Sequence, residues 1–204
     1  MNRFFKYLLI IISVIGGVFL IGSIVTVLMI GCAFGSFDKS YSVTELKDEY
    51  YSKEAEIKDL INYYNKIKPE NYSVDIEFKN DKILERLRII YKDSSNVVYQ
   101  NWNVNSNVLF TEKLKGIAGW NEEQIAVLKN KLDIANCISV EDGEPLKIGF
   151  KRSGLGMFSF NVFQEINTDR SKYNDGCEYI LVNRNLAFQY GGGAIGNQCF
   201  PNKN

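Results

Sequence analysis

Two glycine-containing stretches carry the groups best suited to bind an anion. They are Arg152, Ser153, Gly154 and Gly156 in one stretch, and Gly191, Gly192 and Gly193 in the other. A guanidinium, a hydroxyl and exposed backbone amides together can hold the oxygens of a phosphate or a carboxylate. The spacing of a nucleotide phosphate-binding loop is absent, and no helix pattern follows either stretch. Since glycine also serves tight hairpin turns, the sequence leaves two interpretations open, an anion pocket and a pair of turns.

A second group of residues offers acid–base chemistry. Glu141, Asp142 and Glu144 lie around Gly143. A carboxylate-based hydrolase of the glycosidase type needs two acids held apart across a cleft, so folding would have to bring another acid opposite Asp142 or Glu144. Adjacent acids beside a glycine are also common turn formers. An envelope hydrolase is therefore an alternative function that depends on the fold.

The composition excludes several other classes of chemistry. The chain of 204 residues contains no histidine, which removes Ser-His-Asp triads, Cys-His pairs and HExxH zinc sites. Its 24 basic and 24 acidic residues balance, so we expect no nucleic-acid partner. The stretch Asn174-Asp175-Gly176 lacks the alternating oxygen ligands of a calcium loop. We expect no metal and no cofactor.

The elements that position these residues follow an apolar N-terminal segment. The stretch from Leu8 to Phe37 contains no charged residue. It is longer than the roughly 20 apolar residues that a membrane-spanning helix requires. Arg3 and Lys6 precede this stretch, so the positive-inside rule predicts a cytoplasmic N-terminus. We therefore expect residues 1–37 to be a single-pass anchor that contacts the membrane through residues 8–34, and residues 38–204 to form an extracytoplasmic domain.

Cys32 allows a second interpretation of the anchor. The stretch Leu28-Met29-Ile30-Gly31-Cys32 resembles the lipobox of bacterial lipoproteins, in which the cysteine is acylated after signal cleavage. The other interpretation is a cysteine near the outer end of a transmembrane helix, which the length of the apolar run favours. Both interpretations tether the following domain to the outer face of a membrane.

Two helices are expected in the domain. Ser42-Val43-Thr44-Glu45 has the pattern of a capping box, and apolar residues then recur at intervals of three and four as far as Pro69. A second helix is predicted after Asn121, which can act as its N-cap, with Glu122 and Glu123 at the positive end of the helix dipole.

The remaining pattern is that of antiparallel strands. Tyr72 to Phe78 alternates apolar and polar residues, and the next run around Leu87 and Ile89 alternates them with Arg86 and Arg88. We expect a hairpin whose opposite charges lie on a solvated outer face. Further strands are expected at residues 97–104, 146–150, 158–162, 179–182 and 186–190. The fold class is thus α+β, with a mostly antiparallel sheet of about 5 to 7 strands and two helices.

Three cysteines lie in the expected extracytoplasmic domain, where oxidation is favoured. Cys177 opens one strand of the last hairpin and Cys199 follows the other, so a disulfide between them is the first expectation and Cys137 with Cys199 the second. The absence of histidine argues against a reactive thiol.

None of the sequence patterns described above is a catalytic motif. The sequence favours a non-catalytic binding domain of the cell envelope with a protein partner. Anion or polar-ligand binding through the turn from Arg152 to Gly156, and the carboxylate hydrolase, are the two alternatives.

Overall fold

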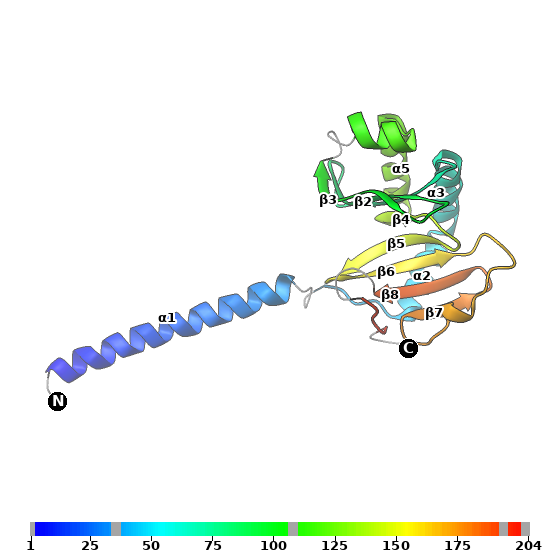
Figure 1. Cartoon of the computed structure of the whole chain (residues 1–204). Helices are drawn as coiled ribbons and strands as arrows, with labels where there is room; N and C mark the ends of the chain where they lie inside the picture. The colour runs from blue at the N-terminus through cyan, green and yellow to red at the C-terminus, as the bar shows by residue number, and fades with distance from the viewer. Residues whose placement is uncertain (1–2, 34–37, 106–109, 192–195, 201–204) are drawn as a thin grey trace.

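The computed structural model describes residues 3–33, 38–105, 110–191 and 196–200. Its first element is α1 (Arg3–Ala33), a helix of 31 residues that extends away from the rest of the molecule (Figure 1). The stretch Phe4–Cys32 is long and apolar enough to cross a membrane. A domain of helices and strands follows, which confirms the expected α+β class.

The segment after residue 42 forms two helices rather than the single long one that its periodicity predicts. They are α2 (Val43–Ser52) and α3 (Glu54–Ile67), with a break at Lys53, whose φ and ψ are −121° and 16°. The predicted capping box is present, since the amide of Glu45 donates to Ser42 Oγ at 3.2 Å and the amide of Ser42 donates to Glu45 Oε2 at 2.8 Å.

The break lets each helix follow a different part of the sheet. Tyr50 of α2 packs edge-on against Phe160, with ring centroids 5.2 Å apart. Tyr64 of α3 instead donates a hydrogen bond from its hydroxyl to the carbonyl of Val74, at 2.6 Å. One straight helix would not cover both regions, because the sheet changes direction between them (Figure 1).

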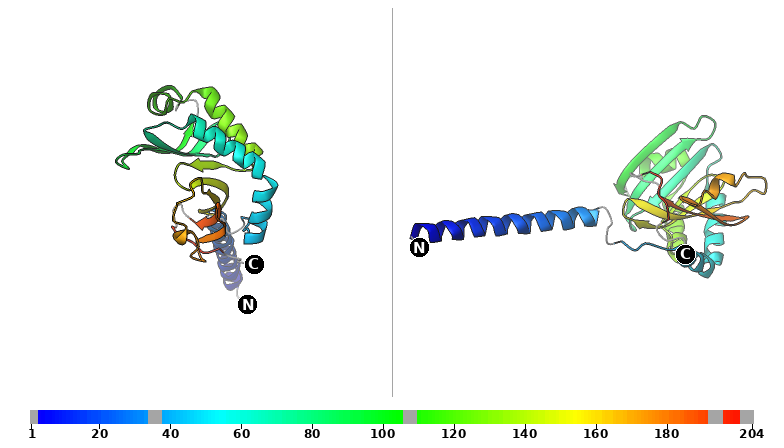
Figure 2. Two further views of the ribbon diagram at one scale, coloured as in Figure 1. Left: turned by 90° about the vertical axis from the view of Figure 1, so that its right-hand side faces the viewer. Right: turned by 90° about the horizontal axis from the view of Figure 1, so that it is seen from below.

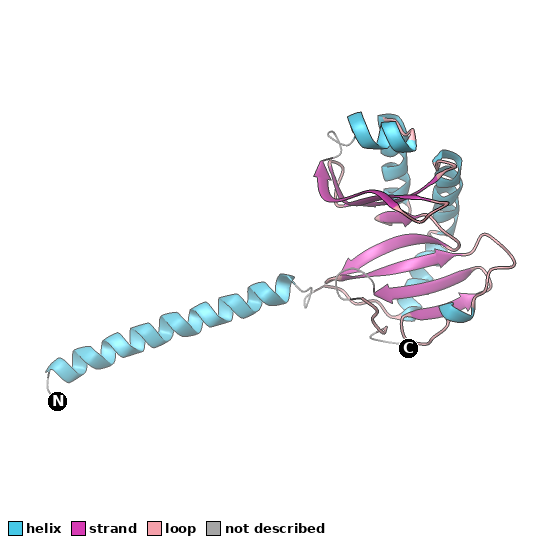
Figure 3. Cartoon of the chain, in the orientation of Figure 1, coloured by secondary structure: helices cyan, strands magenta, loops and turns pink. Residues whose placement is uncertain are grey.

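The described residues form one eight-stranded antiparallel sheet, one strand more than the upper number expected (Figure 3). Its strands are β1 (Tyr72–Phe78), β2 (Ile83–Tyr91), β3 (Val97–Asn105), β4 (Ser139–Glu141), β5 (Leu146–Ser153), β6 (Gly156–Val162), β7 (Tyr179–Asn183) and β8 (Leu186–Gly191). The spatial order is β3-β2-β1-β4-β5-β6-β8-β7. The unexpected strand is β4, whose three residues are too few to show an alternating pattern.

Two runs of strands, each preceded by helices, meet at the centre of this sheet. The first run, β1 to β3, follows α2 and α3; the second, β4 to β8, follows the π-helix η1 (Phe110–Ala118) and α5 (Glu122–Ile134). The predicted cap of α5 is present, since Asn121 accepts a hydrogen bond from the amide of Gln124 at 2.8 Å. The first strands of the two runs, β1 and β4, pair with each other.

The main core lies between these helices and one face of the sheet (Figure 2). Its largest fully buried side chains include Trp120, Tyr64, Phe158, Phe160 and Phe188. On the opposite face, the short 3-10 helix η2 (Ser171–Tyr173) and Phe163 cover Ala187 near β7. We call the rest of that opposite face, from β3 to β8, the open face.

The two edges of the sheet differ. At the β7 edge, the amide of Tyr179 donates to Asp175 Oδ1 at 2.9 Å, the amide of Leu181 donates to Asn174 Oδ1 at 3.3 Å, and the amide of Gly176 donates to the carbonyl of Tyr179 at 3.2 Å. The loop that contributes these groups is fixed by Cys177, whose sulfur lies 1.93 Å from that of Cys199. This disulfide is the pairing that the sequence favoured.

The β3 edge has no such cover among the described residues. Its backbone pairs with β2 on one side, and outside β2 no described residue hydrogen-bonds the backbone of Val98 or Gln100. Val97, Val98 and Trp102 are exposed along this strand. The sheet therefore has one closed edge and one open edge.

Candidate binding surface on the open face of the sheet

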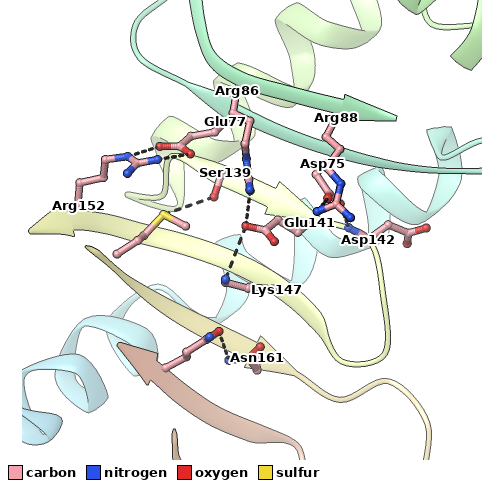
Figure 4. Close-up of polar contacts among 12 residues, drawn as sticks. Asp75, Glu77, Arg86, Arg88, Ser139, Glu141, Asp142, Lys147, Arg152 and Asn161 are labelled. Atoms are coloured by element: carbon pink, nitrogen blue, oxygen red, sulfur yellow. Dashed lines mark hydrogen bonds and ion pairs between the residues drawn. The ribbon is translucent and has the colours of Figure 1, made fainter. Parts of the chain in front are cut away.

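The alternation of the central strands places polar side chains together on the open face. In β1, Val74 and Ile76 point to the helices, so Asp75 and Glu77 lie on the open face. The neighbouring strands add the other members of this polar group, drawn in Figure 4: Arg86 and Arg88 from β2, Ser139 and Glu141 from β4, Lys147 and Arg152 from β5, and Asn161 from β6.

Ion pairs connect these side chains across several strands. Arg152 holds Glu77 with two hydrogen bonds, from Nε to Oε1 at 2.5 Å and from Nη2 to Oε2 at 2.7 Å (Figure 4). Glu141 lies between two cations, with Arg86 Nη2 at 2.6 Å and Lys147 Nζ at 3.7 Å from its Oε1. Bidentate guanidinium–carboxylate pairs are among the strongest protein hydrogen bonds, so Arg152 and Glu77 form the firmest link on this face.

The acids of this face are buried, which corrects the solvated face expected for the first hairpin. Glu77 is 1% exposed and Asp75 is 5% exposed. Next to these acids, β4 and β5 pack closely, with Gly149 facing Ser139 and Met157. A Cβ at Gly149 would lie 2.0 Å from Ser139 Oγ and 2.7 Å from Met157 Sδ, so only glycine permits this close approach. The acids themselves are buried beside long side chains of neighbouring strands, Glu77 beside Arg152 and Asp75 beside Arg88.

Burial changes the acidity of Asp75. Desolvation, together with the nearby charge of Glu141, raises the pKa of the Asp75 carboxyl to about 6, against the opposing influence of Arg86 and Arg88. Its Oδ1 accepts one hydrogen bond, from the amide of Asp142 at 3.2 Å, and Arg88 Nη1 is 3.9 Å from its Oδ2. An ionised Asp75 therefore opposes folding, in contrast to a well-paired carboxylate.

Towards β8 the open face continues with neutral groups and one buried acid. Asn161 Nδ2 donates to Gln189 Oε1 at 3.5 Å, and Gln189 Nε2 donates to Glu178 Oε1 at 2.6 Å. Burial and the adjacent Glu178 raise the pKa of Tyr179, whose hydroxyl lies 2.9 Å from Gln189 Nε2. Polar side chains thus extend across the sheet from β2 to β8.

Some donors on this surface are buried without a protein partner. Arg86 Nε, Arg88 Nε and Ser159 Oγ have no hydrogen-bond partner among the described residues. A buried polar atom without a partner costs about 1 to 3 kcal/mol, so natural proteins rarely retain one without a reason. All three atoms belong to side chains of the open face.

The predicted anion-binding turn is a hairpin whose groups already have partners in the protein. The guanidinium of Arg152 is taken by Glu77, and the amide of Gly154 donates to Asp38 Oδ2 at 2.7 Å. Gly154 has a φ of 59°, the left-handed conformation that the turn interpretation required. The turn does bind a carboxylate, but the carboxylate belongs to the chain itself.

The second glycine stretch lies two strands away from Arg152. Arg152 pairs with Met157, which pairs with Gly191, so Gly191 is about 10 Å from Arg152 across the sheet. Arg152 also points the other way, to Glu77 on β1. Gly192 and Gly193 lie outside the described residues.

Asp142 and Glu144, the acids for which the hydrolase alternative requires another acid opposite, line a cleft of about 450 Å³ at the end of α3 together with Glu165. Asp142 is flanked by Lys68 Nζ at 3.4 Å and Lys92 Nζ at 3.6 Å. Glu144 accepts hydrogen bonds from the amide of Gln164 and the hydroxyl of Thr168, at 3.1 and 2.9 Å. The carboxylates of Asp142 and Glu144 are therefore held by donors of the protein itself.

The remaining cysteines are placed apart from this surface. Cys137 is buried and its thiol donates to the carbonyl of Ala135 at 3.2 Å. Burial raises the pKa of this thiol to about 12, which disfavours the reactive thiolate. Cys32 is exposed on α1. Within the described ranges, no group of three or more His, Cys, Asp or Glu side chains is arranged to hold a metal ion.

Sequence reasoning found the polar row but not its role. The sequence pattern that indicated this row was the placement of acids in β1 opposite arginines in β2, Asp75 opposite Arg88 and Glu77 opposite Arg86. The pattern does not give all of the ion pairs, because Glu77 pairs with Arg152, which lies 75 residues further along the chain.

No protein-family model, curated protein or solved structure matches this chain.

Proposed function

We propose that the protein is a membrane-tethered, non-catalytic binding domain that engages a protein of the cell envelope through the open face of its sheet. The observation that carries this proposal is the row of buried, charged side chains on a sheet face that η2 covers only near β7, including donors without a partner among the described residues. Such a row costs stability, and a partner that completes its hydrogen bonds gives a reason to retain it.

The location proposed for this domain rests on two features. The span Phe4–Cys32 suits a membrane, with Arg3 and Lys6 as the cationic residues of its N-terminal end. The disulfide between Cys177 and Cys199 suits an oxidising compartment. We therefore place the N-terminus in the cytoplasm and the sheet outside.

Mass spectrometry of the purified protein distinguishes the two forms of anchor. A transmembrane helix retains Met1, whereas a lipoprotein begins at an acylated Cys32. Either result keeps the tether, and a soluble protein that lacks both the span and a lipid would contradict it.

Site-specific photo-crosslinking in intact cells tests the binding face. A benzoylphenylalanine at Gln100, which is exposed and lies on the open face opposite Arg88, should yield discrete crosslinked protein adducts. The matched control is the same photo-probe at Asn62, which is exposed on the helix α3. Adducts of equal number and yield from both positions, or none from Gln100, would contradict the proposal.

A further inference from the structure

Charges on the open face are arranged in two layers. The acids form the floor, with the side chains of Asp75 and Glu77 only 7% and 1% exposed. The cations lie above them, with 38% of Arg88 and 33% of Arg152 exposed to solvent. Glu141 is the exception, because at 19% it is as exposed as Arg86 at 18% and Lys147 at 20%, the two cations between which it lies. A molecule that approaches this face therefore meets Arg88 and Arg152 before their acids, and two cations around the single carboxylate of Glu141.

The same cations have unused hydrogen-bonding capacity. Arg86 and Arg88 each use terminal nitrogens toward the acids, and the Nε of each is buried without a partner among the described residues. A guanidinium has five N–H donors, so the exposed part of each side chain, 38% of Arg88 and 18% of Arg86, offers donors to a further carboxylate.

An apolar anchor adjoins these arginines on β3. Trp102 pairs with Arg86 in register, and the guanidinium carbon of Arg86 lies 5.8 Å from the centre of the indole ring. Trp102 is 48% exposed and Val98, on the same side of the strand, is 44% exposed. Exposed tryptophan beside arginine is the composition typical of the energetic centre of a protein interface.

We infer that the open face recognises an acidic surface of a polypeptide, with carboxylates against Arg86, Arg88 and Lys147 and an apolar side chain against Trp102. This inference rests on the proposed function and specifies its partner. A polyphosphate or an anionic lipid headgroup matches the cations but leaves Trp102 and Val98 without a contact. A polypeptide that combines acidic and aromatic side chains matches both.

The probe for this inference is a random copolymer of glutamate and tyrosine, added to the full chain in nanodiscs of phosphatidylcholine. The comparison probes are polyglutamate, a copolymer of lysine and tyrosine, and inorganic polyphosphate. Binding is measured by light scattering and by acrylamide quenching of Trp102, taken as the difference between the wild-type protein and Trp102→Phe. Trp120 contributes little to this quenching because it is 1% exposed.

The glutamate–tyrosine copolymer should bind about tenfold more tightly than each comparison probe and should protect Trp102 from quenching. Raising the ionic strength from about 0.05 to about 0.5 M should weaken binding, since exposed charges are screened. If polyphosphate binds as tightly as the glutamate–tyrosine copolymer, the face binds polyanions in general and the inference is overturned. If polyglutamate binds as tightly as that copolymer, Trp102 is not an anchor and the inference is also overturned. No binding of the glutamate–tyrosine copolymer also overturns it.

Variants with little structural role complete the test. Arg88→Gln and Trp102→Ala should each weaken copolymer binding about tenfold. The control, Lys47→Gln with Lys66→Gln, removes two exposed cations from α2 and α3 and should leave binding unchanged. Circular dichroism confirms that each variant is folded, and the salt titration of the wild-type protein requires no variant.

The crosslinking experiment separates the two proposals. Adducts at Gln100 together with failure of the copolymer to bind would keep the binding face and reject the acidic partner. Absence of both adducts and copolymer binding would reject both.

Discussion

Both faces of this sheet contain buried side chains, but the side chains are buried by different means and with opposite consequences for stability. Phe160 and its neighbours on one face are covered by α2, α3 and α5, and their burial contributes to stability. Asp75 and Glu77 on the other face lie beneath cations from neighbouring strands. The comparison shows that burial alone does not identify a core, because long side chains within a sheet can bury polar groups that lack helix cover.

Among single substitutions, the largest loss of stability is expected on the helix-covered face. Phe160→Ala removes a side chain that is 1% exposed and that contacts Tyr50, Phe150 and Phe188. The free energy of unfolding should fall by about 4 kcal/mol, from lost burial and a cavity. Urea denaturation followed by circular dichroism measures this value. If the free energy of unfolding falls by less than it does in the open-face variants described next, the two faces do not differ in what they contribute to stability.

The next effect concerns Asp75 and depends on pH. Its folded pKa of about 6 lies above the ordinary value of 3.8, so the native state binds the proton more tightly than the unfolded state. Stability from this group is therefore present at low pH and is lost as the pH rises from about 4 through about 6, a total of about 3 kcal/mol.

Asp75→Asn removes this dependence. Relative to the wild-type protein, the variant should gain about 3 kcal/mol of unfolding free energy between pH of about 3.5 and about 7.5. Denaturation curves at several pH values for both proteins provide the measurement. A relative stability that is constant with pH, or that changes in the opposite direction, would show that Asp75 is well paired.

A smaller effect is expected for the firmest ion pair of the open face. Glu77→Gln leaves Arg152 without its carboxylate, and the free energy of unfolding should fall by about 2 kcal/mol. Because Arg152 is 33% exposed, solvent limits the loss. The double variant Glu77→Gln with Arg152→Gln should recover part of the stability in a double-mutant cycle. Strict additivity of the two single changes would mean that the pair contributes no coupling.

The smallest effect is expected at the exposed end of the open face. Trp102→Ala should change the free energy of unfolding by less than about 0.5 kcal/mol, because half of this side chain already contacts solvent. A loss comparable to that of Phe160→Ala would place Trp102 in the core and remove it as a docking residue.

The sequence predicted most of the local structure because local signals determined it. The capping residues Ser42 and Asn121, the hairpin turn at Gly154 and the alternation of β1 all lie in the structure where their patterns indicated. The split at Lys53 and the short strand β4 were missed, because the apolar periodicity does not mark the break and three residues are too few to show an alternating pattern.

The candidate site was less predictable because its contacts are distant in the sequence. The sequence suggested Arg152 as a ligand for a bound anion, and in the structure its guanidinium pairs with Glu77, a residue of the opposite half of the sheet. Asp75 is buried beside Arg88 of β2 and the amide of Asp142, which lies 67 residues further along the chain, and the alternation of β1 does not reveal these contacts. Polar alternation thus predicted which residues share a face, and contacts between distant strands determine how much solvent they retain.

The unequal edges of the sheet limit how far it can grow. The loop held by Cys177 and Cys199 occupies the backbone groups of β7, while β3 leaves those of Val98 and Gln100 available. A strand that joins at β3 extends the sheet in one direction only, and a second copy that joins there presents its own closed edge outward. Assembly through strand addition therefore stops at a pair, so the fold can display an open strand without acting as the seed of a fibril.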